Sequence, residues 1–303
     1  MNASVPCAKS RICAFFAFAL ISTFSNFSQA AAPETQTPIK VTMINSSDGD
    51  FIAAVYGEVL KKIGYKVKYV TVDYAAHYTG LVNDDLDVSL AAWQTTGVEL
   101  TKNALASGKV EDYGPTGVKV TEGWWFPDYV KQLCPGLPNW EALKDPACAK
   151  SLSTAETAPQ GRYVDAPADW GTQSDKMIQD LGLPLVLVNS GSPAALMATF
   201  QGAIDRKEPI VGWMYSPHWF VIQHKGEFVR TQNFHPDVDI LKLANKASMS
   251  KTPVAAQVLH RFTLSTNDVA IGMDEVDNNG VSPQEAAQNW MADHKNIWNA
   301  WVN

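Results

Sequence analysis

The chain has 303 residues and carries 24 basic against 31 acidic side chains, which gives a formal net charge of −7 at pH 7. No clustered basic stretch interrupts this acidic balance, so the sequence disfavours nucleic acid and anionic membrane surfaces as partners. The length is sufficient for a full hydrophobic core and favours two domains over one.

The first thirty residues have the pattern of a secretory signal peptide. Lys9 and Arg11 precede an apolar run over residues 12–24, which is followed by small residues up to the segment QAAAP. The run is too short to cross a bilayer, and no later segment approaches about 18 consecutive apolar residues. We therefore expect cleavage near Ala30 and an exported chain. The sequence around Cys13 does not favour a lipid anchor.

Downstream of the signal peptide, short β-branched runs alternate with segments of helical periodicity. The expected strands cover 39–45, 66–72 and 86–93, and the expected helices cover 49–64 and 74–85. Strands that alternate with helices in this way are typical of parallel sheets built from strand–helix–strand units.

A second region of the same kind begins near residue 117. Its expected strands cover 117–126, 184–188 and 209–213, and its helices follow the segment DWGTQSDK and cover 192–206. A strand over 238–245 and helical segments over 252–262, 265–276 and 282–302 complete the chain. These last helices open on Ser or Thr caps. We infer an α/β protein with two lobes and a C-terminal helical return.

The two cysteines beyond the signal peptide, Cys134 and Cys148, are close in sequence. In an oxidising compartment this spacing predicts a local disulfide, which would stabilise the fold by about 3 kcal/mol in the chain-entropy model. No Cys or His spacing resembles a zinc site. The segment DEVDNNG at 274–280 lacks the later Glu of a calcium loop and is interpreted as a helix-ending turn. We expect no metal and no cofactor.

Four tryptophans lie where a strand ends or a helix opens. In parallel sheets, ligands bind outside the carboxyl ends of the strands. Trp93, Trp124 and Trp213 close expected strands, and Trp170 directly precedes the helix expected to open at Gly171 and Thr172. For one tryptophan alone, core packing is the simpler interpretation, and it is preferred for Trp140, Trp290, Trp298 and Trp301. For the four together, a ligand cage is favoured.

An aromatic cage prefers a cation, because the faces of the rings are negative. A quaternary ammonium group has no N–H and is held by such faces instead of hydrogen bonds. A sugar site would need many hydrogen-bonding side chains, and these strand ends contain few. Strand alternation places Glu122 on the same face as Trp124. Glu122 is either a solvated carboxylate or a group that pairs with the cation or accepts a ligand proton.

Three further positions are candidate ligand contacts. The amides of Gly171 and Thr172 are expected at a helix start, where they would receive an anionic group of the ligand. Asp50, in the turn SSDGD, either reaches the ligand or caps a helix. Tyr215 and His218 follow Trp213, and packing behind the site is favoured for both over ligand contact.

No motif of a known class of enzyme occurs in the chain. The sequence lacks the nucleophile elbow, the HExxH zinc motif, the phosphate-binding loop and the dinucleotide-binding glycines. We therefore expect a binding protein without catalytic residues. A secreted enzyme acting on methylated amines and a binding protein for a sugar or an amino acid remain as alternatives.

Four segments carry a resemblance to a known family. They are GYKVKYVTVDYAAHYTGLVNDDLDVSLAAW, VTEGWWFPDYV, DWGTQSDK and IVGWMYSPHWF. With them the chain resembles the periplasmic substrate-binding proteins of ABC importers for glycine betaine, proline betaine, choline and related trimethylammonium compounds, over nearly its whole length beyond the signal peptide. The resemblance implies a periplasmic location and an inner-membrane ABC permease as partner. We expect a monomer.

The resemblance also implies a fold and a site. The fold is the two-lobed, type II-like periplasmic binding-protein fold, with two doubly wound sheets joined by a two-strand hinge. Lobe 1 is expected to contain residues 38–118 and 228–303, and lobe 2 residues 119–227. Trp93, Trp124, Trp170 and Trp213 match the aromatic box of the family, and the amides after Trp170 match those that grip a ligand carboxylate.

One departure from the family, and the residue Glu122, concern the choice of ligand. Choline-binding relatives carry an aromatic residue in the turn where this chain has SSDGD, which weakens the expectation of choline. Glu122 would oppose the carboxylate of a betaine and suits trimethylamine N-oxide or another ligand with a donor. A protein that presents its ligand to a sensor instead of a permease is compatible with the same sequence.

Overall fold

The computed structural model describes residues 1–3, 33–232 and 234–303. All but three residues of the expected signal peptide lie outside the described residues. Within the described residues, no helix is both long and apolar enough to cross a membrane.

The first group of elements surrounds a mixed sheet. Its strands are β1 (Ile39–Met43), β2 (Val67–Thr71), β3 (Val88–Trp93), β9 (Val238–Asn245) and the first part of β4 (Val110–Pro127). Its helices are α1 (Ser47–Lys62), α2 (Ala76–Val82), α3 (Val98–Ala106), α8 (Lys246–Ser250), α9 (Pro253–Arg261), α10 (Thr266–Asp277), α11 (Pro283–Asp293) and α12 (Lys295–Val302). β1 pairs in parallel with β2 and β3, as the alternation of strands and helices predicts.

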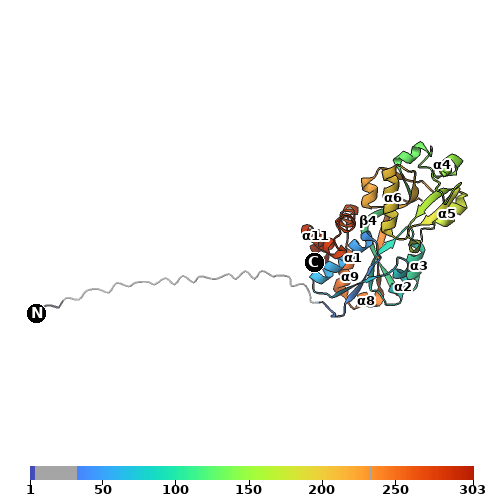
Figure 1. Ribbon diagram of the computed structural model, residues 1–303. Helices are drawn as coiled ribbons and strands as arrows, with labels where there is room; N and C mark the ends of the chain where they lie inside the picture. Colours follow the sequence, from blue (N-terminus) through green and yellow to red (C-terminus); the bar gives the residue numbers. More distant parts are fainter. Residues whose placement is uncertain (4–32, 233) are drawn as a thin grey trace. The chain divides into compact units, whose positions relative to one another are not determined.

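The second group surrounds the strands of the middle segment. They are β5 (Gly161–Asp165), β6 (Leu185–Asn189), β7 (Val211–Ser216), β8 (Gly226–Phe228) and the last part of β4. The helices are α4 (Pro146–Ser151), α5 (Ser174–Leu181), α6 (Pro193–Arg206) and α7 (Trp219–Gln223), with single 3₁₀ turns over Asp128–Gln132, Trp140–Lys144 and Ala168–Trp170. β5 pairs in parallel with β6 and β7. Figure 1 shows α4, α5 and α6 of the second group together at one end of the folded chain, and α1, α8 and α9 of the first group at the other end.

The long strand β4 connects the two groups. Its residues 110–120 pair with β9, and its residues 121–127 pair with β7 and β8, so the described strands follow the order β2-β1-β3-β9-β4-β7-β5-β6 with β8 beside β4. The pairing of β4 with β9 shifts register twice before residue 119. Gly117 lies in the second shift with φ +89, where a side chain would also collide with Thr263 and Leu264.

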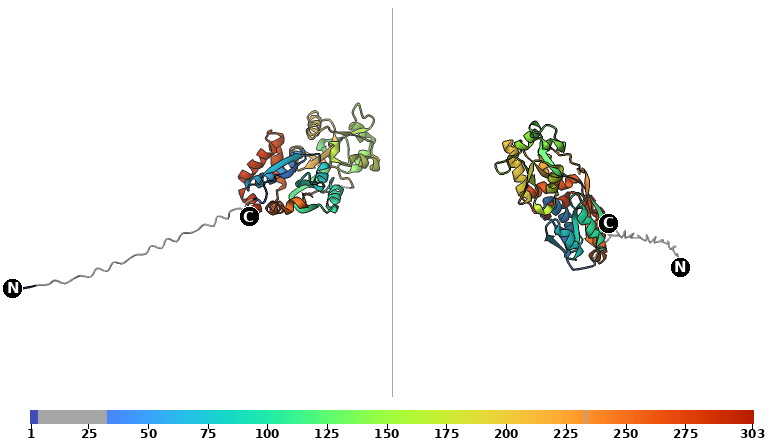
Figure 2. Two further views of the ribbon diagram at one scale, coloured as in Figure 1. Left: turned by 90° about the horizontal axis from the view of Figure 1, so that it is seen from below. Right: turned by 90° about the vertical axis from the view of Figure 1, so that its right-hand side faces the viewer.

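Two separate hydrophobic cores correspond to the two groups. The first contains Phe51, Tyr56 and apolar side chains of the C-terminal helices. Trp290, Trp298 and Trp301 belong to this core, as expected. The second contains Trp125, Tyr163 and Phe200. In the left view of Figure 2 the middle segment, coloured green to yellow, lies on one side and the C-terminal helices, coloured red, lie on the other. An α/β fold is therefore confirmed.

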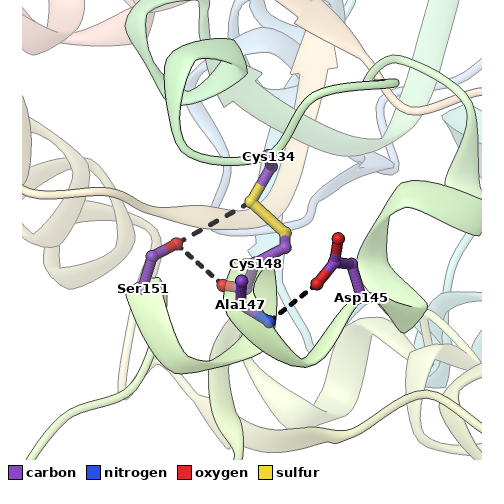
Figure 3. Close-up of a disulfide and its surroundings, with 5 residues drawn as sticks. All are labelled: Cys134, Asp145, Ala147, Cys148 and Ser151. Atoms are coloured by element: carbon purple, nitrogen blue, oxygen red, sulfur yellow. Dashed lines mark hydrogen bonds between the residues drawn. A yellow bond between two sulfur atoms is a disulfide. The ribbon is translucent and has the colours of Figure 1, made fainter.

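The disulfide between Cys134 and Cys148 is confirmed in the second group (Figure 3). Both cysteines are buried. Asp145 accepts a hydrogen bond from the amide of Ala147 at 2.7 Å and caps α4, and Ser151 Oγ donates to the carbonyl of Cys148 at 2.7 Å. The bridge therefore attaches the short helix α4 to the segment that follows β4.

Candidate functional site

A small cavity lies where elements of both groups meet. Most of the side chains that line it are aromatic or carry a carboxyl or hydroxyl group. The lining residues are Ile44, Ser46, Asp48, Tyr74, Trp93, Thr96, Glu122, Trp170, Thr172, Trp213 and Tyr215. Three of the four predicted cage tryptophans, and both Glu122 and Thr172, are among them.

The aromatic walls come from both groups of elements. Trp93 is the last residue of β3 in the first group, and Trp213 and Tyr215 lie two positions apart on one face of β7 in the second. The Tyr215 ring is 5.4 Å from the Trp93 ring and 5.8 Å from the Trp170 ring, nearly edge-on to both. Tyr215 therefore joins two tryptophans into one wall and itself lines the cavity, although the sequence favours packing behind the site for this residue.

Trp124 lies behind the cavity and does not line it. It stands opposite Trp213 in the β4–β7 pairing and is only 1% exposed. Its Nε1 donates to Ser174 Oγ at 3.2 Å, and its ring is 4.7 Å from that of Tyr163. Trp124 does contribute to a wider cleft that shares Trp170 and Trp213 with the cavity. The position at a strand end, which Trp124 and Trp213 share, does not tell which of the two side chains lines the cavity.

Glu122 carries its carboxyl group into the cavity, as strand alternation predicts. Its Oε1 accepts a hydrogen bond from the amide of Thr96 at 2.9 Å. Burial is the main cause that raises the pKa of Glu122 to about 7; the nearby carboxyl of Asp48 acts in the same direction, and the hydrogen bond from Thr96 opposes the shift. Near neutral pH this group is therefore able to act as a hydrogen-bond donor or as an anion.

A second carboxyl group, that of Asp48, lines the cavity from the first turn of α1. Its Oδ1 accepts hydrogen bonds from the hydroxyls of Ser46 and Tyr215. Its Oδ2 is buried and has no hydrogen-bond partner among the described residues. Burial is the main cause that raises the pKa of Asp48. An acceptor left free at the wall of a cavity is available to a ligand.

Asp50, the residue predicted from the same turn, does not line the cavity. Its Oδ1 accepts the amide hydrogen of Ile44 at 2.8 Å and so closes the turn between β1 and α1. Burial is the main cause that raises its pKa to about 7. Two positions along a helix are about 200° apart around its axis, so Asp48 and Asp50 cannot both face the cavity. The structure places Asp48, and not Asp50, in the lining of the cavity.

The segment after Trp170 differs from the expected helix start. A 3₁₀ turn ends at Trp170, Gly171 and Gln173 take left-handed conformations, and α5 begins only at Ser174. The amide of Gly171 donates to the carbonyl of Ala168 at 3.3 Å, and Gly171 lies in the wider cleft. The predicted helix N-terminus at Gly171 is therefore wrong, and with it the reason for an anion site there.

Thr172 lines the cavity, and the segment that carries it is fixed by hydrogen bonds to Asp165. Its hydroxyl donates to Asp165 Oδ2 at 2.7 Å, and the hydroxyl of Ser174 donates to Asp165 Oδ1 at 3.2 Å. Asp165 ends β5 and is buried. These bonds attach the segment with Trp170 to the second group of elements.

His218 supports the aromatic wall as a neutral ring. Its Nδ1 accepts the amide hydrogen of Phe220 at 3.1 Å, and its ring is 5.0 Å from that of Tyr215. Burial lowers the pKa of His218 to about 3. In the part of the chain that the structure describes, no group of three or more His, Cys, Asp or Glu side chains could hold a metal ion.

The cavity thus combines electron-rich ring faces with two carboxyl groups. Its lining, within the described residues, includes no Lys or Arg. Such a site attracts a small cation or a dipole whose positive end is covered by methyl groups. It disfavours a free anionic group beside Asp48 and Glu122.

Comparisons with known proteins agree with this chemistry. Residues 37–293 match the family model described as the substrate binding domain of ABC-type glycine betaine transport systems. The trimethylamine N-oxide-binding protein of Pelagibacter ubique (strain HTCC1062) is 30% identical over 298 residues, which cover 92% of this chain and 94% of that protein.

Solved structures share the fold at lower identity. The closed lactococcal OpuAC with glycine betaine matches with a TM-score of 0.74 at 23% identity, over 88% of this chain and 100% of that one. An ABC-transporter choline binding protein in complex with choline matches with a TM-score of 0.77 at 18% identity, over 89% of this chain and 93% of that one. The predicted two-lobed α/β fold is thereby confirmed.

Proposed function

Because the chain belongs to the family of substrate-binding domains of ABC-type glycine betaine transport systems, we propose that it binds trimethylamine N-oxide in preference to glycine betaine. The observation that carries this proposal is the presence of two carboxyl groups, Asp48 and Glu122, in one cavity walled by Trp93, Trp170 and Trp213. A relative that matches over most of its length is a trimethylamine N-oxide-binding protein, which supports the same choice.

The two ends of the N-oxide suit the two parts of the cavity. The methyl groups spread the positive charge over a surface that packs against ring faces, and each desolvated ring contributes about 1 to 2 kcal/mol. The oxygen needs a hydrogen-bond donor. Glu122 supplies one in its neutral form, which its raised pKa makes accessible near neutral pH. The carboxylate of glycine betaine would instead lie in a cavity whose described lining contains two acids and no basic residue.

Choline is a second candidate, favoured by the free oxygen of Asp48. Choline is a permanent cation with one hydroxyl donor, and Asp48 Oδ2 is a buried acceptor without a partner among the described residues. A hydroxyl that donates to this oxygen would satisfy both groups.

Calorimetric titration with trimethylamine N-oxide, choline and glycine betaine tests the proposal. We expect the wild-type protein to bind the N-oxide most tightly and glycine betaine most weakly. Asp48→Asn should weaken choline binding by about tenfold, through the loss of a charged acceptor. The same variant should strengthen glycine betaine binding, because one like charge is removed. Tightest binding of glycine betaine by the wild-type protein would contradict the assignment.

We further propose that residues 38–118 and 228–303 form one lobe and residues 119–227 the other, and that the lobes close over the ligand. Two separate cores, connected through β4 and β9, support this division. Closure would expel water and strengthen the contacts with the rings. A decrease in the radius of gyration on adding ligand, measured by small-angle X-ray scattering, is the expected result. An unchanged radius would contradict closure.

The remaining parts of the proposal concern the place of the protein in transport. The chain is exported after cleavage near Ala30 and delivers its ligand, as a monomer and without chemical conversion, to an ABC permease. The acidic surface and the lack of enzyme motifs support this role. Sedimentation of the mature protein tests whether it is a monomer, and NMR spectra of ligand incubated with it test whether the ligand is left unconverted. A dimer or a converted ligand would contradict them.

A further inference from the structure

Trp219 packs against both hydrophobic cores without lining the cavity. It opens α7 in the second group of elements and is partly buried. Among the described residues, only Trp170 and Trp219 are partly buried side chains that pack against both cores. Trp170 is a wall of the cavity, whereas Trp219 is absent from its lining. Trp219 therefore joins the two groups at a place that a ligand in the cavity does not touch.

A hydrogen bond accompanies this packing. The indole Nε1 of Trp219 donates to Asp277 Oδ2 at 2.7 Å. Asp277 is the last residue of α10 and belongs to the first group. An indole N–H can only donate, and a bond to a carboxylate is among the stronger hydrogen bonds. Moving the two groups apart would break this bond.

The same carboxylate reaches the turn that carries the site. Asp277 Oδ2 also accepts the hydroxyl hydrogen of Ser47 at 3.0 Å. Ser47 lies between Ser46 and Asp48, which both line the cavity. Tyr215 donates to Asp48 from the other side of this turn. Asp277 therefore connects the Trp219 contact, through Ser47, to the same turn that Tyr215 contacts at Asp48.

We propose that Trp219 and Asp277 form a latch that holds the closed state and sets the residence time of the ligand without selecting among ligands. The inference rests on the proposed closure of the two lobes. The apparent affinity for a ligand is its intrinsic affinity multiplied by the fraction of protein that is able to close. A contact that forms only on closure therefore changes the apparent affinities for all ligands by the same factor. A residue in the wall of the cavity would change different ligands by different factors.

Trp219→Phe is the variant that tests the latch, because it keeps an aromatic ring and removes the N–H donor. We expect dissociation rates in stopped-flow fluorescence to rise by about three- to tenfold, with association rates little changed. The factor should be equal for trimethylamine N-oxide and choline. Asp277→Ala should have the same effect, and the double variant should be no worse than either single one.

The structure offers a matched control within one group. Trp290 Nε1 donates to Asp268 Oδ1 at 3.0 Å, and both residues belong to the first group. Trp290→Phe removes the same kind of bond, so it should lower the melting temperature without changing the dissociation rate.

The latch would be overturned by a wild-type dissociation rate in Trp219→Phe, by factors that differ between ligands, or by additive effects of the two single variants. Failure of the proposed function has a different signature, since the wild-type protein itself would then bind glycine betaine most tightly.

Discussion

The pH dependence of binding should reveal which form of Glu122 contacts the ligand. Burial raises the pKa of this carboxyl to about 7, so its protonation changes within the range where the protein can be assayed. A complex with the N-oxide contains a proton between the carboxyl and the oxygen, which ionised Glu122 cannot supply. A complex with choline instead gains from the ionised form. The two ligands should therefore respond to pH in opposite directions.

The magnitude follows from a single titration. With a pKa of about 7, affinity for the N-oxide should fall about tenfold between about pH 6 and about pH 8, and affinity for choline should rise by about the same factor. The other groups that face Glu122 in the cavity are Asp48, Tyr74 and Tyr215. Burial raises the pKa values of both tyrosines well above the ordinary value, so they stay neutral over this range.

The assay is calorimetry of both ligands at a series of pH values, with Glu122→Gln as the control. The amide keeps the size of the side chain and has no proton to exchange, so both slopes should disappear. Asp48→Asn, which leaves Glu122 in place, should retain the opposite slopes. Parallel slopes for the two ligands, or slopes that persist in Glu122→Gln, would refute this account of Glu122.

The same raised pKa predicts how the stability of the unliganded protein depends on pH. The folded-state pKa of Glu122 lies above its ordinary value, so the contribution to stability is complete below about pH 4.5 and is lost as the pH rises through about 7. Glu122→Gln should therefore stabilise the unliganded protein more at pH 8 than at pH 5, as measured by thermal unfolding. An equal effect at both values would show that the carboxyl is not buried.

Three other predictions concern the walls, their support and the disulfide. Trp213→Ala should cost at least about 2 kcal/mol of binding free energy by calorimetry, through loss of a desolvated ring; near wild-type affinity would remove it from the cage. A side chain at Gly97 would collide with the hydroxyl of Tyr74, a wall of the cavity, so Gly97→Ala should weaken binding and lower the melting temperature, and an unchanged affinity would contradict this. Replacing Cys134 and Cys148 together by Ala should cost about 3 kcal/mol of unfolding free energy in denaturant titration while affinity stays constant; a loss of affinity would connect the loop to the site.

Much of the fold and part of the site could be predicted from the sequence, because they depend on local patterns. Alternation of β-branched and helical runs indicated the parallel strand pairs, and the cysteine spacing indicated the disulfide. Strand alternation correctly directed Glu122 into the cavity. The rule that ligands bind outside the carboxyl ends of parallel strands singled out Trp93 and Trp213, and both line the cavity.

Other parts of the site depended on how distant segments pack. Trp124 shares a face with Trp213, yet it is covered by Ser174 and Tyr163, while Tyr215 reaches the cavity and bonds to Asp48. Periodicity tells which residues share a face of a helix or a strand. It does not tell which face meets the other half of the molecule, and that contact is decided only when β4 and β9 bring the two cores together.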